Sequence, residues 1–446
     1  MERLIWAVEQ LQGKVDKAQL SKIAELIIQA MTGPWRYFHT PEHIFEVGES
    51  GDAIEVLAAL FHDLVYVQVD QGISINISKY IAAFVKETRQ QLMIREKDEL
   101  PEDALFFLVC HLFGMEPGQP LSPMGGQNEF LSAIIAAKSL EPFLATSTLM
   151  EIAACIEATV PFRPRLPSGE TVNERLYRRM VELNDRLGFQ WSEAHIEESI
   201  KRSVRVANRD VENFASPYAA HFLDNTWNLI PETNHALSGD NSYTVRGYRS
   251  SIEKMEGFMN FLKPELVFQQ FRGEPDGETL AQLGERTRQN IEIARLYLGA
   301  KLLSIAVLEA LSLRLGGNIP LSTMMGEFPM PGFPVYQLEN FLPELPPDCS
   351  GPQTEIEAEV LNLLENGRSQ DSRYDIKNSP VSTYFVKAIG FSEIYRLLAE
   401  AKGFFKGTVD AETFLTSCNP MVIENITEGV LQLFECRKSA ISRTIP

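Results

Sequence analysis

Residues 35–66 read WRYFHTPEHIFEVGESGDAIEVLAALFHDLVY and contain three of the chain's seven histidines, His39, His43 and His62. The third is followed directly by Asp63, inside the apolar run LAALFHDLVYV. Burying a carboxylate without a partner costs free energy, so this His-Asp pair needs a compensating charge. A divalent cation is one such partner, because imidazole and carboxylate groups are its usual ligands.

The pattern on both sides of the first two histidines predicts helices. Thr40-Pro41 is typical of an N-cap followed by proline in the first helical turn, which places His43 in that turn and His39 just before it. The positive end of the helix dipole disfavours an added proton on either ring, and a metal ligand must be a neutral imidazole. Residues 53–69 are strongly apolar and predict one helix with the His-Asp pair near its centre.

Most of the remaining chain also has the periodicity of helices. Apolar residues recur at three- and four-residue spacing, and no sustained alternation or short Asn-Gly or Asp-Gly turn predicts a strand. A helix expected over residues 192–214, with Ser192 as its N-cap, carries Asp210 at the edge of its apolar stripe. The predicted fold class is therefore all-α.

The length of 446 residues exceeds the usual size of one domain. By composition the best boundary is residues 231–241, PETNHALSGDN. We therefore expect an N-terminal domain over residues 1–235 and a C-terminal helical domain over residues 240–446. Within the second domain, residues 316–352 hold eight of the 25 prolines and are expected to form an extended connector.

The composition of the chain argues against several classes of protein. The net charge of −19 argues against a protein that follows a nucleic-acid polymer, although local arginines could still bind a small phosphorylated molecule. The five cysteines are scattered without a CxxC pair, as in cytoplasmic proteins with reduced thiols. The chain begins without a secretory signal, and its most apolar region, residues 296–315, is interrupted by charges. We expect a cytoplasmic protein that does not span a membrane, with homo-oligomerisation left open.

Four residues form the candidate metal site: His43, His62, Asp63 and Asp210. Their two nitrogens and at least two oxygens suit Mn, Mg, Zn or Fe and leave coordination positions for water and substrate. A metal with open positions acidifies bound water and polarises a phosphoryl oxygen. The neighbouring His39 could then protonate the leaving oxygen.

This ordered set resembles the HD superfamily of metal-dependent phosphohydrolases. The resemblance is carried by HxxxHxxxV at residues 39–47, by the His-Asp pair and by the isolated helical Asp210. The segment RYFHTPEHIFEV…AALFHDLVY is similar to small bacterial predicted HD phosphohydrolases and to class I cyclic-nucleotide phosphodiesterases. The similarity is clear over residues 33–70 and extends weakly to about residue 215.

The resemblance implies an HD-type helical bundle over the N-terminal domain, with His39 as the general acid. It also implies that Asp63 serves catalysis as a metal ligand, together with His43, His62 and Asp210. The activity expected from it is hydrolysis of a phosphoester or phosphoanhydride bond in a small molecule, with a nucleotide as the favoured substrate. A metal-bound water would be the nucleophile.

Other residues are weaker candidates. Arg36, Arg163 and Arg165 could grip phosphate oxygens, although each arginine taken singly is more often structural. His111, in the run FFLVCHLF, could bind a second metal, but a lone histidine on an apolar face is more often a core residue. Glu157 could accept a hydrogen bond from a metal ligand.

Two other functions stay open at this point. Some diiron oxygenases share the HD fold, and a ligand role for His111 would favour that reading. A regulatory or scaffold protein that binds a ligand without turnover is also compatible with the sequence, because the long region after residue 240 has no assigned role.

Overall fold

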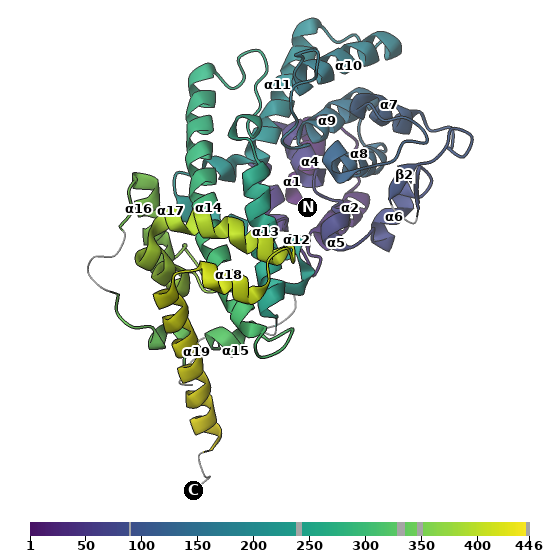
Figure 1. Ribbon diagram of the computed structural model, residues 1–446. Helices are drawn as coiled ribbons and strands as arrows, with labels where there is room; N and C mark the ends of the chain where they lie inside the picture. The colour runs from purple at the N-terminus through teal and green to yellow at the C-terminus, as the bar shows by residue number, and fades with distance from the viewer. Residues whose placement is uncertain (89–90, 238–242, 328–334, 346–350, 443–446) are drawn as a thin grey trace. The chain divides into compact units, whose positions relative to one another are not determined.

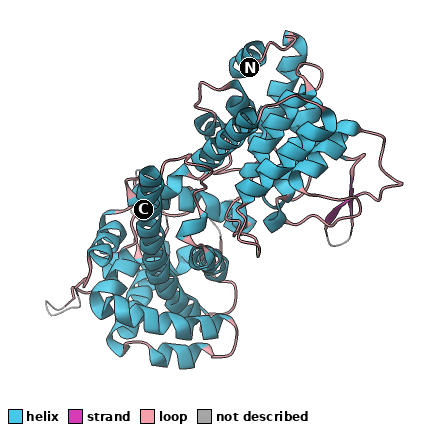
Figure 2. Cartoon of the chain, turned by 90° about the horizontal axis from the view of Figure 1, so that it is seen from above, coloured by secondary structure: helices cyan, strands magenta, loops and turns pink. Residues whose placement is uncertain are grey.

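The computed structural model describes residues 1–88, 91–237, 243–327, 335–345 and 351–442. This part of the chain is built of helices apart from one small sheet, as Figure 1 and Figure 2 show. The predicted all-α class is therefore confirmed. Among the described residues, no helix combines the length and the hydropathy that a membrane span would need.

The chain forms two compact units. The N-terminal unit comprises residues 1–215 and 263–287, and the C-terminal unit comprises residues 216–262 and 288–446. The boundary expected at residues 231–241 falls inside the C-terminal unit, and its last residues, from 238 on, lie outside the described part of the chain. Proline and glycine mark breaks in local structure, whereas the units are defined by packing, so the two boundaries do not coincide.

The N-terminal unit is centred on α9, which packs against α4, α7, α8, α10 and α11. Every residue of α4 is buried, which explains the uninterrupted apolar run that precedes the His-Asp pair. The unit's longer helices are α1 (Glu2–Gln10), α2 (Lys17–Met31), α3 (Pro41–Val47), α4 (Ala53–Phe61), α6 (Ile75–Ile81), α7 (Ala104–Phe113), α8 (Gln127–Leu140), α9 (Thr146–Ala158), α10 (Val172–Leu187) and α11 (Glu193–Asp210).

One hairpin departs from the helical expectation. Strands β1 (Val85–Glu87) and β2 (Leu92–Ile94) pair antiparallel, with Val85 opposite Ile94. Both of these side chains are buried in the core of the N-terminal unit. Strands of three residues are too short to give a sustained alternation, which is why the sequence pattern did not reveal them.

The segment expected to form one helix over residues 53–69 is broken in two. Helix α4 ends at Phe61, His62 occupies its C-cap position, and Asp63 lies in the turn that follows. A short helix, α5 (Val67–Asp70), begins after this turn. The His-Asp pair therefore sits at a helix end and not at a helix centre.

Side chains from α8 explain the break. The backbone N–H of Val65 donates to Ser132 Oγ at 3.0 Å, and that of Val67 donates to Asn128 Oδ1 at 3.2 Å. Backbone donors that find side-chain acceptors do not need the carbonyl oxygens of a continuing helix. Two polar residues of a distant helix thus shape the turn that carries Asp63.

The C-terminal unit is also helical. Most of the apolar residues of α14 between residues 291 and 311 are buried in it. The region expected to be an extended connector contains α15 and a short 3-10 turn (Leu338–Phe341), while residues 328–334 and 346–350 lie outside the described part. The unit's longer helices are α12 (Ala219–Thr233), α13 (Val245–Phe261), α14 (Gly277–Ser312, from residue 288), α15 (Leu321–Met325), α16 (Glu355–Asn366), α17 (Pro380–Phe405), α18 (Ala411–Ser417) and α19 (Pro420–Ile441).

Candidate metal centre

The four predicted ligands meet at one point of the N-terminal unit. One ligand atom from each of His43, His62, Asp63 and Asp210 lies within 4.8 Å of the other three. Asp210 Oδ1 lies 3.1 Å from Nε2 of both histidines. Asp63 Oδ2 lies 3.0 Å from His62 Nε2 and 3.4 Å from His43 Nε2. We call this group the metal centre.

Local structure aims each histidine at the two carboxylates. Thr40 and Pro41 begin α3 as the sequence predicts, and His43 follows in the first turn. The ring of His62 is fixed from behind, because its Nδ1 lies 2.8 Å from the carbonyl oxygen of Ala59. A carbonyl oxygen can only accept, so Nδ1 carries the proton and Nε2 is the nitrogen available to a metal.

Asp210 is the last residue of α11, and ion pairs hold that helix end in place. The neighbouring Arg209 donates from Nη2 to Glu55 Oε2 at 2.7 Å and from Nε to the carbonyl oxygen of Val47 at 2.8 Å. Glu55 is 2% exposed and also accepts from Arg205 Nε at 2.8 Å. A carboxylate of α4 and a carbonyl at the end of α3 therefore anchor the helix that supplies Asp210.

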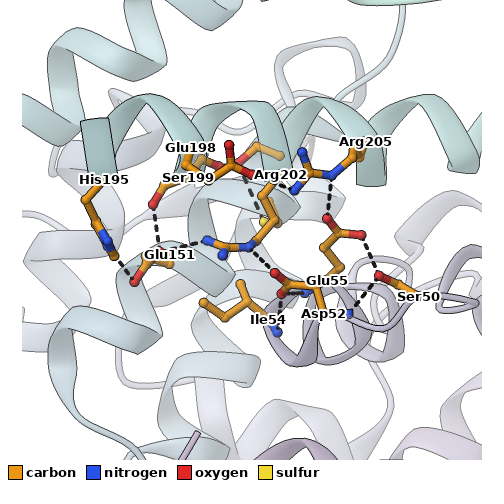
Figure 3. A network of polar contacts seen from close by, with 12 residues as sticks. Ser50, Asp52, Ile54, Glu55, Glu151, His195, Glu198, Ser199, Arg202 and Arg205 are labelled. Atoms are coloured by element: carbon orange, nitrogen blue, oxygen red, sulfur yellow. Dashed lines mark hydrogen bonds and ion pairs between the residues drawn. The ribbon is translucent and has the colours of Figure 1, made fainter. Parts of the chain in front are cut away.

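Figure 3 shows the continuation of this network along α11. Arg202 donates from Nε to Asp52, the N-cap of α4, at 2.8 Å and from Nη1 to Glu151 of α9 at 2.9 Å. Ser199 donates to the same Glu151 at 2.6 Å. Three helices are thus joined by buried and half-buried charges. These pairs have no local sequence signature, because their partners are about 50 to 150 residues apart.

The metal centre is strongly polarised. Burial acts to lower the pKa of His43, but the hydrogen bond to Asp210 and the nearby carboxylates of Asp210 and Asp63 outweigh it and raise that pKa to about 9. Burial also acts to lower the pKa of His62, but the charges of Asp63 and Asp210 outweigh it and raise that pKa well above its usual value. Burial acts to raise the pKa values of both carboxyl groups, and the histidines, with His62 the largest opposing charge, lower them. Without a metal, the two carboxylates therefore raise the pKa of His43, against the lowering expected from the helix dipole.

The residues fit a divalent cation by charge and by donor geometry. Two protonated histidines balance two carboxylates, and a doubly charged ion in place of the two protons keeps the same balance. Asp63 Oδ2 is shielded from solvent and makes no hydrogen bond of good geometry with the described residues, although it lies close to the ring nitrogens. A buried carboxylate oxygen with an unused lone pair is what a metal ligand offers.

His39 lies beside the metal centre without belonging to it. Its ring centroid is 5.8 Å from that of His43 and 4.6 Å from that of Tyr66. Its charge also acts on Asp63, lowering the pKa of that carboxyl. This position matches the expectation that His39 flanks the metal ligands.

Arg36 has a structural role in place of the phosphate-binding role considered from the sequence. Its side chain is fully buried and forms an ion pair with Asp70 at 2.7 Å. Its Nη1 donates to the carbonyl oxygen of Asp63 at 2.8 Å. The guanidinium therefore braces the turn that carries Asp63, and its full burial leaves it no face for a substrate.

The other weak candidates lie outside the metal centre. His111 Nε2 is 3.1 Å from Glu182 Oε2 at a site that is about one third exposed. Glu157 is 2% exposed and is bound by Arg163, whose Nη1 lies 2.7 Å from Glu157 Oε1. The structure brings neither His111 nor Glu157 to the four ligands.

One residue that the sequence did not indicate is Glu129, in the first turn of α8. Its Oε2 is shielded from solvent and has no hydrogen-bond partner among the described residues. Burial raises the pKa of this carboxyl to about 8, and the charges of Asp63 and Asp210 add to the effect. A glutamate in a first turn is ordinary, so only the packing of α8 against the turn after Asp63 could reveal it.

Comparisons with other proteins give no family for this chain. No protein-family model matches it, and neither the curated proteins nor the solved structures contain a match. The resemblance to the HD superfamily thus rests on the residues of this sequence and stays a prediction.

Proposed function

We propose that the N-terminal unit is a metal-dependent phosphohydrolase that acts on a small phosphate ester or anhydride, with a nucleotide favoured. The observation that carries the proposal is the convergence of His43, His62, Asp63 and Asp210 within 4.8 Å. Two imidazoles and two carboxylates are a ligand set for Mn, Mg, Zn or Fe, and they leave positions for other ligands. Their order in the chain also resembles that of HD phosphohydrolases.

The residues around the metal centre have separable roles in this reaction. When bound, a divalent ion supplies an acidified water and polarises a phosphoryl oxygen. His39 is placed beside the ligands, where its imidazolium can give a proton to the leaving oxygen. Arg36 fixes the backbone of Asp63, and Arg209 fixes the end of α11, so that the two carboxylates keep their separation.

The first test is elemental analysis of the purified chain after loading with Mn²⁺ and desalting. We expect one or two ions per chain in the wild type and a loss of bound metal in His62→Ala. His111→Ala is the matched control, because that histidine pairs with Glu182 away from the metal centre. Circular dichroism spectra of all three proteins would establish that each is folded.

The second test is turnover on a panel of phosphomonoesters, phosphodiesters and nucleotides. We expect Asp63→Ala to lose more than about 100-fold in kcat/KM on the best substrate, since removing a ligand exceeds the usual loss from removing a ligand's support. Wild-type turnover in Asp63→Ala would refute the proposal. Two bound irons per chain would favour the oxygenase alternative, and no bound metal would favour the scaffold alternative.

A further inference from the structure

A pocket in the N-terminal unit is lined by arginines. It lies at the loop that follows α9 and encloses about 330 Å³, within the range of small-molecule sites. Its charged lining includes Arg163, Arg165 and Arg175, and its apolar lining includes Phe113, Met124 and Val160. We call it the arginine pocket.

The arginine pocket is basic in a chain whose net charge is −19. Arg179, whose Nη1 lies 3.7 Å from Glu157 Oε1, adds a fourth guanidinium group beside the pocket. Three carboxyl groups lie near the four arginines: Glu157, which pairs with Arg163, Glu129, which interacts electrostatically with Arg163, and Glu174, whose pKa is lowered mainly by a hydrogen bond from the backbone N–H of Thr171 and in part by Arg165. The balance is positive, so gathering these guanidinium groups costs free energy unless an anion joins them.

The arginines also have donors to offer. Among the described residues, Arg175 Nε is shielded from solvent and has no hydrogen-bond partner. Arg165 makes one long bond, 3.4 Å from Nη1 to the carbonyl oxygen of Gly169. Arg163 is fixed by Glu157, which presents it in one orientation. A planar guanidinium with unused donors is well suited to phosphate oxygens.

Glu129 is within electrostatic range of both this pocket and the metal centre. Its carboxyl interacts electrostatically with Asp63 and Asp210 on one side and with Arg163 on the other. Met124 and Gly125, which line the pocket, lead directly into the first turn of α8 that carries Glu129. Both sites therefore belong to the N-terminal unit, and the charges of both act on Glu129.

We propose that the arginine pocket binds a phosphate group of the substrate other than the group held at the metal centre. The substrate class is then a small molecule with at least two phosphates, such as a nucleoside diphosphate or triphosphate. This inference rests on the proposed hydrolase function. It adds a binding site whose residues contribute no ligand to the metal centre.

Calorimetric titration of the full chain with pyrophosphate, in the presence of EDTA, tests the pocket without metal. We expect Arg175→Gln to bind pyrophosphate about tenfold more weakly than the wild type, the usual result of losing one charge-assisted contact. Arg178→Gln is the matched control, because Arg178 is on the same helix, is 56% exposed and pairs with Glu170. Arg175→Lys, which keeps the charge, should fall between the two and guards against misfolding of the glutamine variant.

Three results of the binding titrations would overturn the inference. They are no pyrophosphate binding to the wild type, equal affinity in Arg175→Gln, or a loss of binding in Asp63→Asn that Arg175→Gln does not share, which would place the anion at the metal centre. A kinetic comparison separates a substrate phosphate from free phosphate. Arg175→Gln should raise KM about tenfold for a nucleoside diphosphate and leave KM for p-nitrophenyl phosphate unchanged. Equal KM changes for both would also overturn the inference.

Failure of this inference and failure of the proposed function give different results. If the chain shows no phosphohydrolase turnover but Arg175→Gln still weakens pyrophosphate binding, the anion site stands and the hydrolase proposal fails. If turnover depends on Asp63 but is indifferent to Arg175 on every substrate, the hydrolase proposal stands and the pocket has no role in substrate binding.

Discussion

Each unit buries an aspartate among polar side chains, but the two groups differ in what balances the charge. In the C-terminal unit, Asp375 Oδ2 lies 2.8 Å from Lys301 Nζ and accepts hydrogen bonds from Tyr248 OH at 2.7 Å and Trp227 Nε1 at 2.8 Å. We call this group the Asp375 cluster. Its cation is part of the chain, and Oδ2 of its carboxylate has three polar partners within the unit.

The metal centre lacks a fixed cation. Asp63 and Asp210 face two imidazoles, which are positive only while they hold a second proton. Asp63 Oδ2 also makes no hydrogen bond of good geometry with the described residues. Both groups bury charge, but only the Asp375 cluster contains a lysine that balances its carboxylate.

The largest difference between the two groups is expected in the stability lost when the aspartate of the Asp375 cluster is removed. Asp375→Ala leaves Lys301 buried with no carboxylate, and breaking a buried pair in this way costs about 3–5 kcal/mol of stability. Urea unfolding followed by fluorescence should show that loss, while metal content stays at the wild-type value. A fall in bound metal in Asp375→Ala would show that the two groups are not independent.

A substitution at the metal centre should lower metal affinity with little effect on the free energy of unfolding. Asp210→Asn removes a charged ligand but keeps the shape of the side chain, so we expect Mn²⁺ affinity to fall by about 100-fold, at the upper end of what supporting residues contribute. Unfolding of the EDTA-treated protein should change much less than in Asp375→Ala. Isothermal titration with Mn²⁺ measures the first quantity, and unchanged affinity would remove Asp210 from the ligand set.

The sequence predicted the residues of the metal centre better than the contacts that hold these residues in place. His43, His62, Asp63 and Asp210 were identifiable because imidazole and carboxylate side chains in an apolar context require a chemical reason. The end of α4 at Phe61 was not identifiable from the sequence. It depends on α8 side chains such as Ser132, which accept hydrogen bonds from the backbone N–H groups that follow α4.

Pairs between distant residues explain the other differences. Glu55 and Arg209 are 154 positions apart, so no local pattern reveals that they hold the end of α11. Arg36 was considered for phosphate binding because its ion-pair partner, Asp70, is 34 positions away and no local pattern links the two residues. The all-α class followed from periodicity alone, since helical spacing is a local property that single sequences display.

Positioning of Asp210 gives the next effect in size. Glu55→Gln keeps the volume of the side chain but weakens its bonds to Arg205 and Arg209, so the end of α11 is less firmly held. We expect about tenfold weaker Mn²⁺ binding. Glu198→Gln is the control, because Glu198 pairs with the same Arg205 but is 53% exposed. Equal affinities in the two variants would show that the network does not position the ligand.

The pH dependence of metal binding follows from the protons on the histidines. The pKa of His43 is raised to about 9 without metal, so below that pH an incoming ion must displace its proton. Mn²⁺ affinity should rise about tenfold for each pH unit per proton displaced, and titration in buffers of different ionisation enthalpy would count the protons released. Affinity that is flat between pH 6.5 and 8.5 would contradict the proposed ligands.

The same protons predict opposite trends in stability for the two forms of the protein. A raised folded-state pKa for His43 stabilises the EDTA-treated protein fully below pH 6.5, and this contribution is lost as the pH rises to about 9. The stabilisation from saturating Mn²⁺ grows over the same range, because binding tightens. Thermal unfolding with and without Mn²⁺ should therefore diverge with increasing pH.

The smallest effect concerns Glu129, whose carboxyl lies next to the metal centre without a hydrogen-bond partner for Oε2 among the described residues. Because burial raises its pKa to about 8, the folded protein keeps a proton there that the unfolded chain releases above about pH 4.5, and this costs stability as the pH rises from 4.5 to 8. Glu129→Gln removes the titration, so the EDTA-treated variant should unfold about 2–4 °C above the wild type at pH 8 and at nearly the same temperature at pH 4.5. If Glu129→Gln instead unfolds at a lower temperature than the wild type at pH 8, the charged Glu129 carboxylate is already compensated by its surroundings. The metal centre would then resemble the Asp375 cluster more closely than is indicated by the oxygens of Asp63 and Glu129 that are unpartnered in the described part of the chain.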